Sequence, residues 1–184
     1  SFTAQGMLSQ NWSVIIPSYP QAPDVKITQI THSISKLVYK ILDDCNGSVR
    51  MIGHSAGGHL ASRMICKNFL KKNMGNHIEK VISVSGLYDL RPLLMTKLND
   101  ILKLDYEEAV RESCFLYDPI DTKLICWVGA NERPEFLRQN RILTEAWSKK
   151  SKNIESYYDP GKDHFTVIDQ LEEKESLLTQ SITK

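Results

Sequence analysis

Short apolar runs alternate along this chain with longer segments in which apolar residues recur every three or four positions. The short runs are compact and rich in β-branched and aromatic residues, so they predict strands at 12–16, 49–52, 81–84, 125–128 and 154–158. Strands that alternate with helices are typical of a parallel sheet covered on both faces. The pattern therefore predicts an α/β fold with a mostly parallel sheet and helices on both faces.

Four longer segments carry the helical spacing, at 27–41, 56–73, 134–150 and 167–178. Asn46 and Gly47 are expected to end the first of them. A polar, helix-rich insertion separates the third and fourth strands and holds the apolar residues Leu93, Leu94, Leu98, Ile101, Leu102 and Leu104. No repeat, low-complexity tract or linker divides the sequence, so we expect one domain over 1–184.

Composition and charge exclude several classes of function. The 184 residues carry 23 basic and 22 acidic side chains, a net charge of +1 that gives no electrostatic footprint for nucleic acid or an anionic membrane. No apolar run approaches the roughly eighteen residues of a membrane span. The four cysteines are widely spaced, without a CxxC pair, which favours reduced thiols and a cytoplasmic protein.

A candidate nucleophile lies between the second predicted strand and the helix that follows it. Residues 53–57 read Gly-His-Ser-Ala-Gly and fit G-x-S-x-G, the nucleophile elbow of α/β-hydrolases, in which a sharp turn lifts the serine hydroxyl above the sheet. The following helix would place its positive end beneath a developing oxyanion. The alternative is a glycine-rich turn with an ordinary serine. The strand and helix on either side favour Ser55 as the nucleophile.

A serine nucleophile needs a base within hydrogen-bond reach, and five histidines are available. The order nucleophile, acid, histidine along the chain of an α/β-hydrolase requires a late histidine. His164 follows the last predicted strand, whereas too few elements separate His77 from Ser55 to supply an acid-bearing strand. We therefore predict His164 as the general base. The alternative is a solvated loop histidine.

The acid that orients the base should follow the strand before last, and Glu132 lies just beyond 125–128. Its alternative role is a surface carboxylate that caps the next helix. Glu135 is the nearest competitor, but it is better placed to complement the helix dipole from the first turn. Asp121 precedes the strand, at the wrong end of the sheet, and Asp163 is the immediate sequence neighbour of His164.

Four segments resemble the kynurenine formamidases (arylformamidases): GHSAGGHL at 53–60, SGLYDLRPL at 85–93, VGANERPEFLRQ at 128–139 and DHF at 163–165. The resemblance implies a serine hydrolase that converts N-formyl-L-kynurenine to L-kynurenine and formate in tryptophan catabolism. It assigns the nucleophile to Ser55, the base to His164 and the acid to Glu132, where the family usually has aspartate. It also implies a small aromatic formamide as substrate, no metal or organic cofactor, no nucleic-acid or membrane partner, and room for a homodimer.

The chain departs from that family at the oxyanion loop. The family carries an HGG-type motif after an earlier strand, and no such motif occurs in these 184 residues. Residues 1–10 read as the helix that follows that loop, so we expect an N-terminally incomplete α/β-hydrolase fold: a fragment or isoform of a longer protein, or a protein that has lost part of its site. The N–H of Ala56 would remain as one oxyanion donor.

The loss of one oxyanion donor typically costs about 10²–10³ in rate. Residues 12–16 would also lack a strand partner on one side. We therefore expect the chain alone to be poorly soluble and to have little or no formamidase activity. Two other functions stay open: a carboxylesterase of small aryl or acyl esters, and an inactive hydrolase-fold fragment that binds a ligand or partner. Leu87, Tyr88 and Phe165 fit an aromatic substrate wall and plain core equally well.

Overall fold

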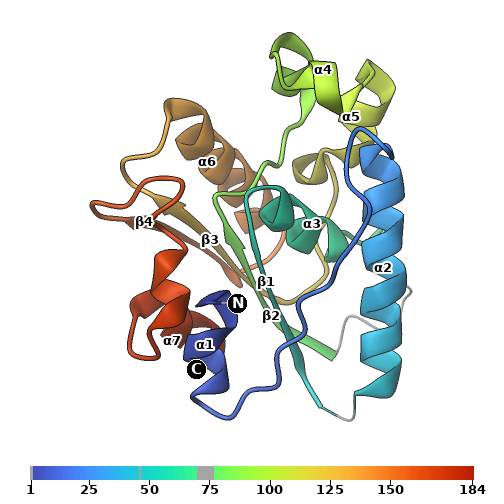
Figure 1. Ribbon diagram of the computed structural model, residues 1–184. Helices are drawn as coiled ribbons and strands as arrows, with labels where there is room; N and C mark the ends of the chain where they lie inside the picture. Colours follow the sequence, from blue (N-terminus) through green and yellow to red (C-terminus); the bar gives the residue numbers. More distant parts are fainter. Residues whose placement is uncertain (1, 46, 70–76) are drawn as a thin grey trace.

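The computed structural model describes residues 2–45, 47–69 and 77–184. Its centre is a parallel sheet of β1 (Val49–His54), β2 (Ile78–Val84), β3 (Lys123–Gly129) and β4 (Ile154–Asp159), in the order β1-β2-β3-β4 (Figure 1). Four of the five predicted strands are thus confirmed. The sheet is parallel because a helical or irregular crossover returns the chain to the same end before each new strand.

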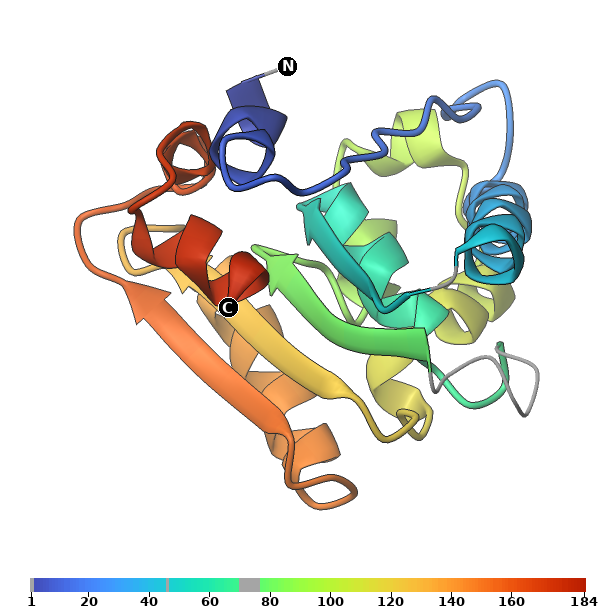
Figure 2. The ribbon, with the colours of Figure 1, turned by 90° about the horizontal axis from the view of Figure 1, so that it is seen from below.

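Helices cover both faces of the sheet, as the alternating pattern predicts (Figures 1 and 2). On one face lie α3 (Ala56–Met64) and α6 (Pro134–Ser148), with α2 (Ile27–Asp44) packed outside α3. The other face is covered by α1 (Gln5–Leu8), which follows a short 3-10 turn, η1 (Phe2–Ala4), and by α7 (Leu177–Thr183).

Successive residues of β3 show why both faces are apolar. Leu124 and Cys126 pack in the cluster under α3 and α6, whereas Ile125 and Trp127 pack in the cluster under α1 and α7. Side chains alternate between faces along a strand, so a strand that is covered on both sides must be apolar throughout. This is why the sequence shows continuous apolar runs rather than an alternation of apolar and polar residues.

The insertion after β2 is helix-rich, as predicted. It consists of η3 (Arg91–Met95), α4 (Asn99–Leu102), α5 (Tyr106–Glu112) and η4 (Cys114–Leu116). Of its predicted apolar residues, Leu104 is buried, whereas Leu98 and Ile101 are about half exposed, at 46% and 50%. The insertion therefore presents part of its apolar surface to solvent.

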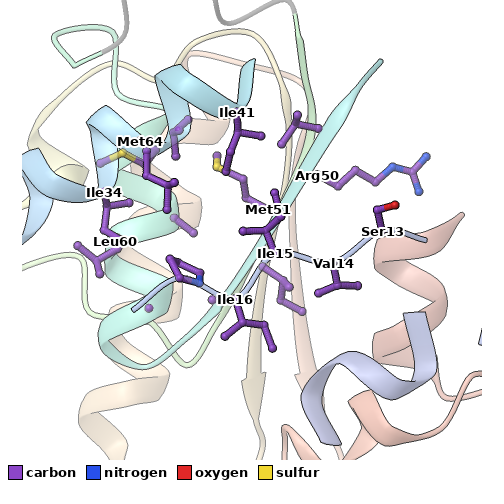
Figure 3. A pocket seen from close by; sticks show the side chains of 18 of the residues that line it. Ser13, Val14, Ile15, Ile16, Ile34, Ile41, Arg50, Met51, Leu60 and Met64 are labelled. Carbon is purple, nitrogen blue, oxygen red and sulfur yellow. The ribbon is translucent and has the colours of Figure 1, made fainter. Parts of the chain in front are cut away.

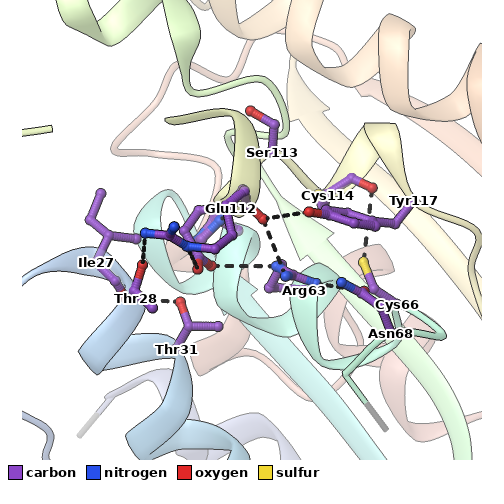
Figure 4. Close-up of polar contacts among 12 residues, drawn as sticks. Ile27, Thr28, Thr31, Arg63, Cys66, Asn68, Glu112, Ser113, Cys114 and Tyr117 are labelled. Atoms are coloured by element: carbon purple, nitrogen blue, oxygen red, sulfur yellow. Dashed lines mark hydrogen bonds and ion pairs between the residues drawn. The ribbon is translucent and has the colours of Figure 1, made fainter. Parts of the chain in front are cut away.

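A buried polar cluster fixes the insertion to α3 (Figure 4). The Arg63 guanidinium is 2% exposed, and its Nε lies 3.4 Å from Oε2 of Glu112 in α5. It also donates to the Asn68 side chain and to the Arg111 carbonyl, and it lies between the rings of Phe69 and Tyr117. These contacts give nearly every polar atom of the guanidinium a partner away from water.

The predicted strand at 12–16 is wrong. This segment has no regular secondary structure, and Ile15 and Ile16 are 59% and 58% exposed. A strand exists only through hydrogen bonds to a neighbour, and no strand of the described residues lies along this segment. Strand propensity alone therefore does not make it a strand.

Two predicted helices are shorter than expected. The helix predicted at 56–73 ends at Met64, and Cys66 instead pairs with Pro119 in an isolated bridge, while 70–73 lie outside the described residues. The closing helix predicted at 167–178 is divided into η5 (Asp169–Glu172) and α7. Ser176 divides them: its side chain caps α7 and its hydroxyl donates to the Gln170 carbonyl.

The other helix predictions are confirmed within a few residues. The helix predicted at 27–41 is α2, which ends at Asp44; Asn46, expected to help end it, lies outside the described residues. The helix predicted at 134–150 is α6, and the one expected at 1–10 is represented by η1 and α1. Among the described helices, none combines the length and the apolar character that a bilayer crossing requires.

Candidate active site

Each of the four strands is followed by one member of a polar cluster. Ser55 follows β1, Ser85 follows β2, Glu132 lies in the turn after β3, and His164 lies in the loop after β4. The carboxyl ends of parallel strands share one edge of the sheet, so residues far apart in the sequence meet there. The topology therefore concentrates these side chains at one rim.

The backbone of Ser55 has the strained geometry that the elbow motif predicts. Its φ and ψ are 54° and −114°, a left-handed region that residues with a side chain rarely occupy. Gly53 permits the sharp turn, because a Cβ there would lie 2.0 Å from the Gly57 carbonyl oxygen. The Ser55 N–H is fixed by the Val84 carbonyl at 2.8 Å, and α3 begins at the next residue, Ala56.

The structure brings the three predicted side chains together in one hydrogen-bonded chain. His164 Nε2 lies 3.2 Å from the Ser55 Oγ, and His164 Nδ1 lies 2.7 Å from Oε2 of Glu132. With its proton on Nδ1, the imidazole donates to Glu132 and leaves Nε2 free to accept from the serine hydroxyl. The Glu132 side chain is fully buried, whereas that of His164 is 21% exposed and accessible from the rim.

Glu132 is held as a carboxylate by three donors. His164 binds Oε2, and Oε1 accepts from the Ser85 hydroxyl and from the Gly129 N–H at 3.0 Å. Burial by itself would raise the pKa of Glu132, but the hydrogen bonds from His164, Ser85 and the Gly129 N–H outweigh it and lower the pKa. The acid is thus ionised at neutral pH despite its burial.

Ser85 is a site residue that sequence reasoning missed. It is buried, has a positive φ of 51°, and anchors its N–H on the Trp127 carbonyl at 2.7 Å, which directs the hydroxyl at Glu132. Its signal in the sequence was its position: a hydroxyl residue placed directly after a buried strand, at the same end of the sheet as Ser55.

His54 is a second residue whose part in the site was missed. Its Nε2 donates to the backbone carbonyl of His164 at 2.8 Å, and the two imidazole rings lie 4.7 Å apart. Burial and the adjacent His164 lower the pKa of His54, so it remains a neutral donor. His54 therefore holds the loop that carries His164 against the elbow.

The competing residues have other partners. Glu135 binds the Arg138 guanidinium at 2.8 and 2.7 Å, and Asp163 accepts the N–H groups of Phe165 and Thr166 within its own turn. Asp121 interacts with Ser151 and Asn153. Of the other histidines, His59 is buried against the Glu112 carbonyl, while His32 and His77 are exposed. None of these side chains bonds Ser55 or His164.

Two aromatic rings lie beside the imidazole of His164. The Phe136 ring lies 4.2 Å from that of His164, and the Phe165 ring lies 5.5 Å away with 78% of its surface exposed. Tyr88, by contrast, is fully buried and donates to the Ser83 hydroxyl, so it belongs to the core. The aromatic surface beside the site is thus provided by Phe136, which was not predicted, and Phe165, which was considered.

Comparison with known proteins places this arrangement among hydrolases. No protein-family model matches the chain. The kynurenine formamidase of Danio rerio is 29% identical over 194 aligned positions, which cover all of this chain and 65% of that protein. The chain thus spans about two thirds of the length of that relative.

Solved structures agree on the fold. A candidate thioesterase from Silicibacter sp. TM1040 is 40% identical with a TM-score of 0.92 over all of this chain and 68% of its own. An esterase from the archaeon Pyrobaculum calidifontis is 15% identical with a TM-score of 0.71 over 90% of this chain and 63% of its own. At 15% identity, the similarity to this esterase shows a shared fold and nothing about activity.

Proposed function

We propose that this chain, which belongs to the kynurenine formamidase-like α/β-hydrolases, carries the catalytic centre of a serine hydrolase that cleaves N-formyl-L-kynurenine to L-kynurenine and formate. The observation that carries the proposal is the unbroken series of contacts from Ser55 Oγ through His164 to the buried Glu132. A serine hydroxyl becomes a useful nucleophile only with such a base beside it.

In the first half of the reaction, His164 Nε2 takes the Ser55 proton as Oγ attacks the formyl carbon. Glu132 keeps the imidazole in the tautomer that can accept this proton and stabilises the imidazolium that results. The protonated His164 then gives its proton to the arylamine nitrogen as the carbon–nitrogen bond breaks. L-Kynurenine leaves, and the formyl group remains as an ester on Ser55.

In the second half, water attacks the formyl ester while His164 accepts a proton from it. Collapse of the second tetrahedral intermediate releases formate, and the proton returns from His164 to Ser55 Oγ. Each intermediate carries an oxyanion, and the Ala56 N–H at the start of α3 is the donor that we assign to it. No step requires a metal or an organic cofactor.

The substrate class is supported by the surroundings of His164. The Phe136 ring in contact with the imidazole and the exposed Phe165 ring provide an apolar surface for an aryl leaving group. A small aromatic formamide could place its ring there while its formyl carbon faces Ser55. The free state of the four cysteines, three of them buried, is compatible with a cytoplasmic setting for this reaction.

A fluorophosphonate probe tests the nucleophile directly, because the probe reacts with an activated serine even where turnover is slow. We expect the probe to label the chain once, and the Ser55→Ala variant not at all. Ser13→Ala, at an exposed position whose side chain makes none of the hydrogen bonds of His164, is the matched control and should label like the parent. Labelling that persists in Ser55→Ala would place the reactive serine elsewhere.

An esterase or thioesterase is the second candidate, favoured by the 40% identity to the candidate thioesterase from Silicibacter. The two functions predict different preferred substrates. The preferred substrate is the one for which the ratio of the catalysed to the uncatalysed rate of hydrolysis is largest. N-formyl-L-kynurenine, 4-nitrophenyl acetate and an acetyl thioester should be compared on this scale, since activated esters react fast without help. The proposal requires the formamide to show the largest acceleration, and a larger one for either ester would establish the second candidate.

A further inference from the structure

The substrate of the proposed reaction has a charged end. Beyond its aromatic ring, N-formyl-L-kynurenine carries an amino-acid group with an ammonium and a carboxylate. With the formyl carbon at Ser55 and the ring against Phe136, this group extends past the aromatic surface beside His164. An anion that leaves water needs a cation or several N–H donors as partners. A site that selects this substrate should therefore offer such donors close to Phe136.

The cavity beside β1 does not suit a carboxylate. It has a volume of about 590 Å³, lies between α2, α3 and the segment 12–17, and has mainly apolar walls (Figure 3). Arg50 is the one charged residue among the described residues that line it, and its guanidinium already binds Glu79 and the Ile182 carbonyl. A carboxylate in this cavity would lose its hydration without gaining a free cation.

Two arginines lie near the carboxyl edge of the sheet, on the two elements that border the site. Arg91 ends the segment that begins at Ser85, and Arg138 lies in the second turn of α6, the helix that carries Phe136. Their guanidinium groups converge on Asp89. Arg91 Nη2 lies 3.0 Å from Asp89 Oδ2, and Arg138 Nη2 lies 3.8 Å from the same oxygen. The two positive groups are therefore neighbours.

Gln139 fixes this pair of arginines close to the aromatic surface. It is buried, accepts from the N–H groups of Tyr88 and Asp89, and donates to the Asp89 carbonyl at 2.8 Å. Gln139 lies three residues after Phe136, so the two side chains leave neighbouring positions on the surface of α6. The Phe136 ring in turn lies 4.2 Å from that of His164. One turn of α6 thus connects the base with Asp89.

The cluster has a net positive charge on its solvent side. The Asp89 side chain is only 7% exposed, whereas those of Arg91 and Arg138 are 39% and 33% exposed. Glu135 is 44% exposed and occupies Nε and Nη2 of Arg138, but Nη1 has no partner among the residues that the structure describes. Two guanidinium groups and one carboxylate therefore face solvent. Guanidinium N–H groups have the planar geometry that binds a carboxylate.

We propose that Arg91 and Arg138 bind the carboxylate of the amino-acid group of N-formyl-L-kynurenine. The inference rests on the proposed function, because it assigns the same substrate. An extended amino-acid group spans about 5 Å beyond the ring. One helical turn is about 5.4 Å long, so a ring against Phe136 places the carboxylate at the second turn of α6, where Arg138 lies. This contact separates the formamide from a simple aryl ester, which has no carboxylate.

The test measures binding without turnover, in a Ser55→Ala chain that cannot form the formyl ester. The two probes are N-formyl-L-kynurenine and ortho-formamidoacetophenone, which keeps the ring, the ketone and the formamide but lacks the amino-acid group. Dissociation constants come from ligand-observed NMR titrations, which suit weak binding. We expect N-formyl-L-kynurenine to bind at least about tenfold more tightly, because charge-assisted hydrogen bonds hold its carboxylate.

Variants of the two arginines, made in the same Ser55→Ala chain, locate the carboxylate. Arg138→Gln and Arg91→Gln should each weaken binding of N-formyl-L-kynurenine by about five- to tenfold and leave that of ortho-formamidoacetophenone unchanged. Arg141→Gln is the matched control, because Arg141 lies on the same helix but pairs with Glu145. It should bind both probes like the parent.

Two results would overturn the proposal: equal affinity of the parent for the two probes, or an unchanged ratio of affinities in both arginine variants. Equal weakening of both probes belongs to the second result, since it would mean that the arginines only hold α6 and the loop after β2 together. Failure of the proposed function is read separately, because fluorophosphonate labelling of Ser55 does not involve the substrate carboxylate. Binding of neither probe would overturn this proposal together with the proposed substrate.

Discussion

The side chains of the site are held by neighbours that themselves take no part in the proposed bond changes. Glu132 receives one hydrogen bond from the base and two from supports, the Ser85 hydroxyl and the Gly129 N–H. Gly129 has a second role besides its hydrogen bond to Glu132. A Cβ at this position would lie 2.4 Å from the Lys162 carbonyl oxygen, in the loop that carries His164. A residue without a side chain is therefore required where the acid and base loops approach.

Removal of the charge at Glu132 tests its proposed role. Glu132→Gln would put an amide against His164 Nδ1 and favour the wrong tautomer, so fluorophosphonate labelling should slow by about 10³–10⁴. Glu135→Gln is the matched control: it lies three residues away, pairs with Arg138, and should label at close to the parent rate. Similar losses in both variants would show that local folding, not the acid, is affected.

Removal of the Ser85 hydroxyl tests a positioning role. Ser85→Ala deletes one of the bonds that lower the pKa of Glu132, so this pKa should rise and labelling should slow by about ten- to a hundredfold. The distinguishing readout is the pKa of the Glu132 carboxyl, followed by carbon-13 NMR, which should be higher in Ser85→Ala than in the parent.

The control for Ser85 is Ser83→Ala. Ser83 is a buried serine of β2, two residues before Ser85, whose hydroxyl donates to the Gly58 carbonyl and accepts from Tyr88, away from the acid. Its variant should lower stability without changing the pKa of Glu132. An unchanged Glu132 pKa in Ser85→Ala would reduce Ser85 to a packing residue.

At the scale of elements, a buried ion pair supports the connection between α3 and the insertion. Arg63 and Glu112 are 2% and 1% exposed, so neither charge can be hydrated if the other is removed. Arg63→Met should therefore lower the free energy of unfolding by about 3–5 kcal/mol. Urea denaturation followed by tryptophan fluorescence measures it.

The double variant Arg63→Met/Glu112→Gln is the control for that prediction. It removes both charges, so the cost should be well below that of Arg63→Met alone, because no carboxylate is left unpaired. Equal losses in the single and double variants would mean that the contacts of the guanidinium with Phe69 and Tyr117, not the charge, hold the insertion.

At the scale of the whole molecule, the buried His59 and the partly buried His54 make stability depend on pH. Burial lowers the pKa of His59 below its ordinary 6.5, and burial with His164 nearby does the same for His54. Below pH 6.5 the unfolded chain takes up protons that the folded chain still refuses, so stability should fall with falling pH. The carboxylates with lowered pKa values, such as Glu132, add their losses only below about 4.5, the ordinary value for glutamate.

The variant His59→Gln tests how much of this pH dependence comes from His59. Glutamine can still donate to the Glu112 carbonyl, as His59 Nε2 does, but it does not titrate. Between pH 6.5 and 5, the slope of unfolding free energy against pH should become smaller by up to about 1.4 kcal/mol per pH unit. An unchanged slope would show that His59 is protonated in the folded state.

The sequence by itself determined the parts that depend on local pattern. Short runs rich in β-branched and aromatic residues identified β1 to β4. In β3 the run is continuously apolar because that strand is covered on both faces. The G-x-S-x-G elbow identified Ser55, since only small neighbours permit its turn, and the chain order identified His164 and Glu132 as its partners. These inferences rest on periodicity and on the rule that the carboxyl ends of parallel strands share an edge.

Tertiary structure alone decided the features that need a distant partner. The segment 12–16 has the composition of a strand, yet it stays irregular because strand hydrogen bonds require a neighbouring strand. Ser85 and His54 belong to the site because of contacts with residues far away in the sequence. Ser85 bonds Glu132, and His54 bonds the backbone carbonyl of His164. Local pattern sets what a segment can form, but hydrogen bonds between distant segments are fixed only by the packing of the whole chain.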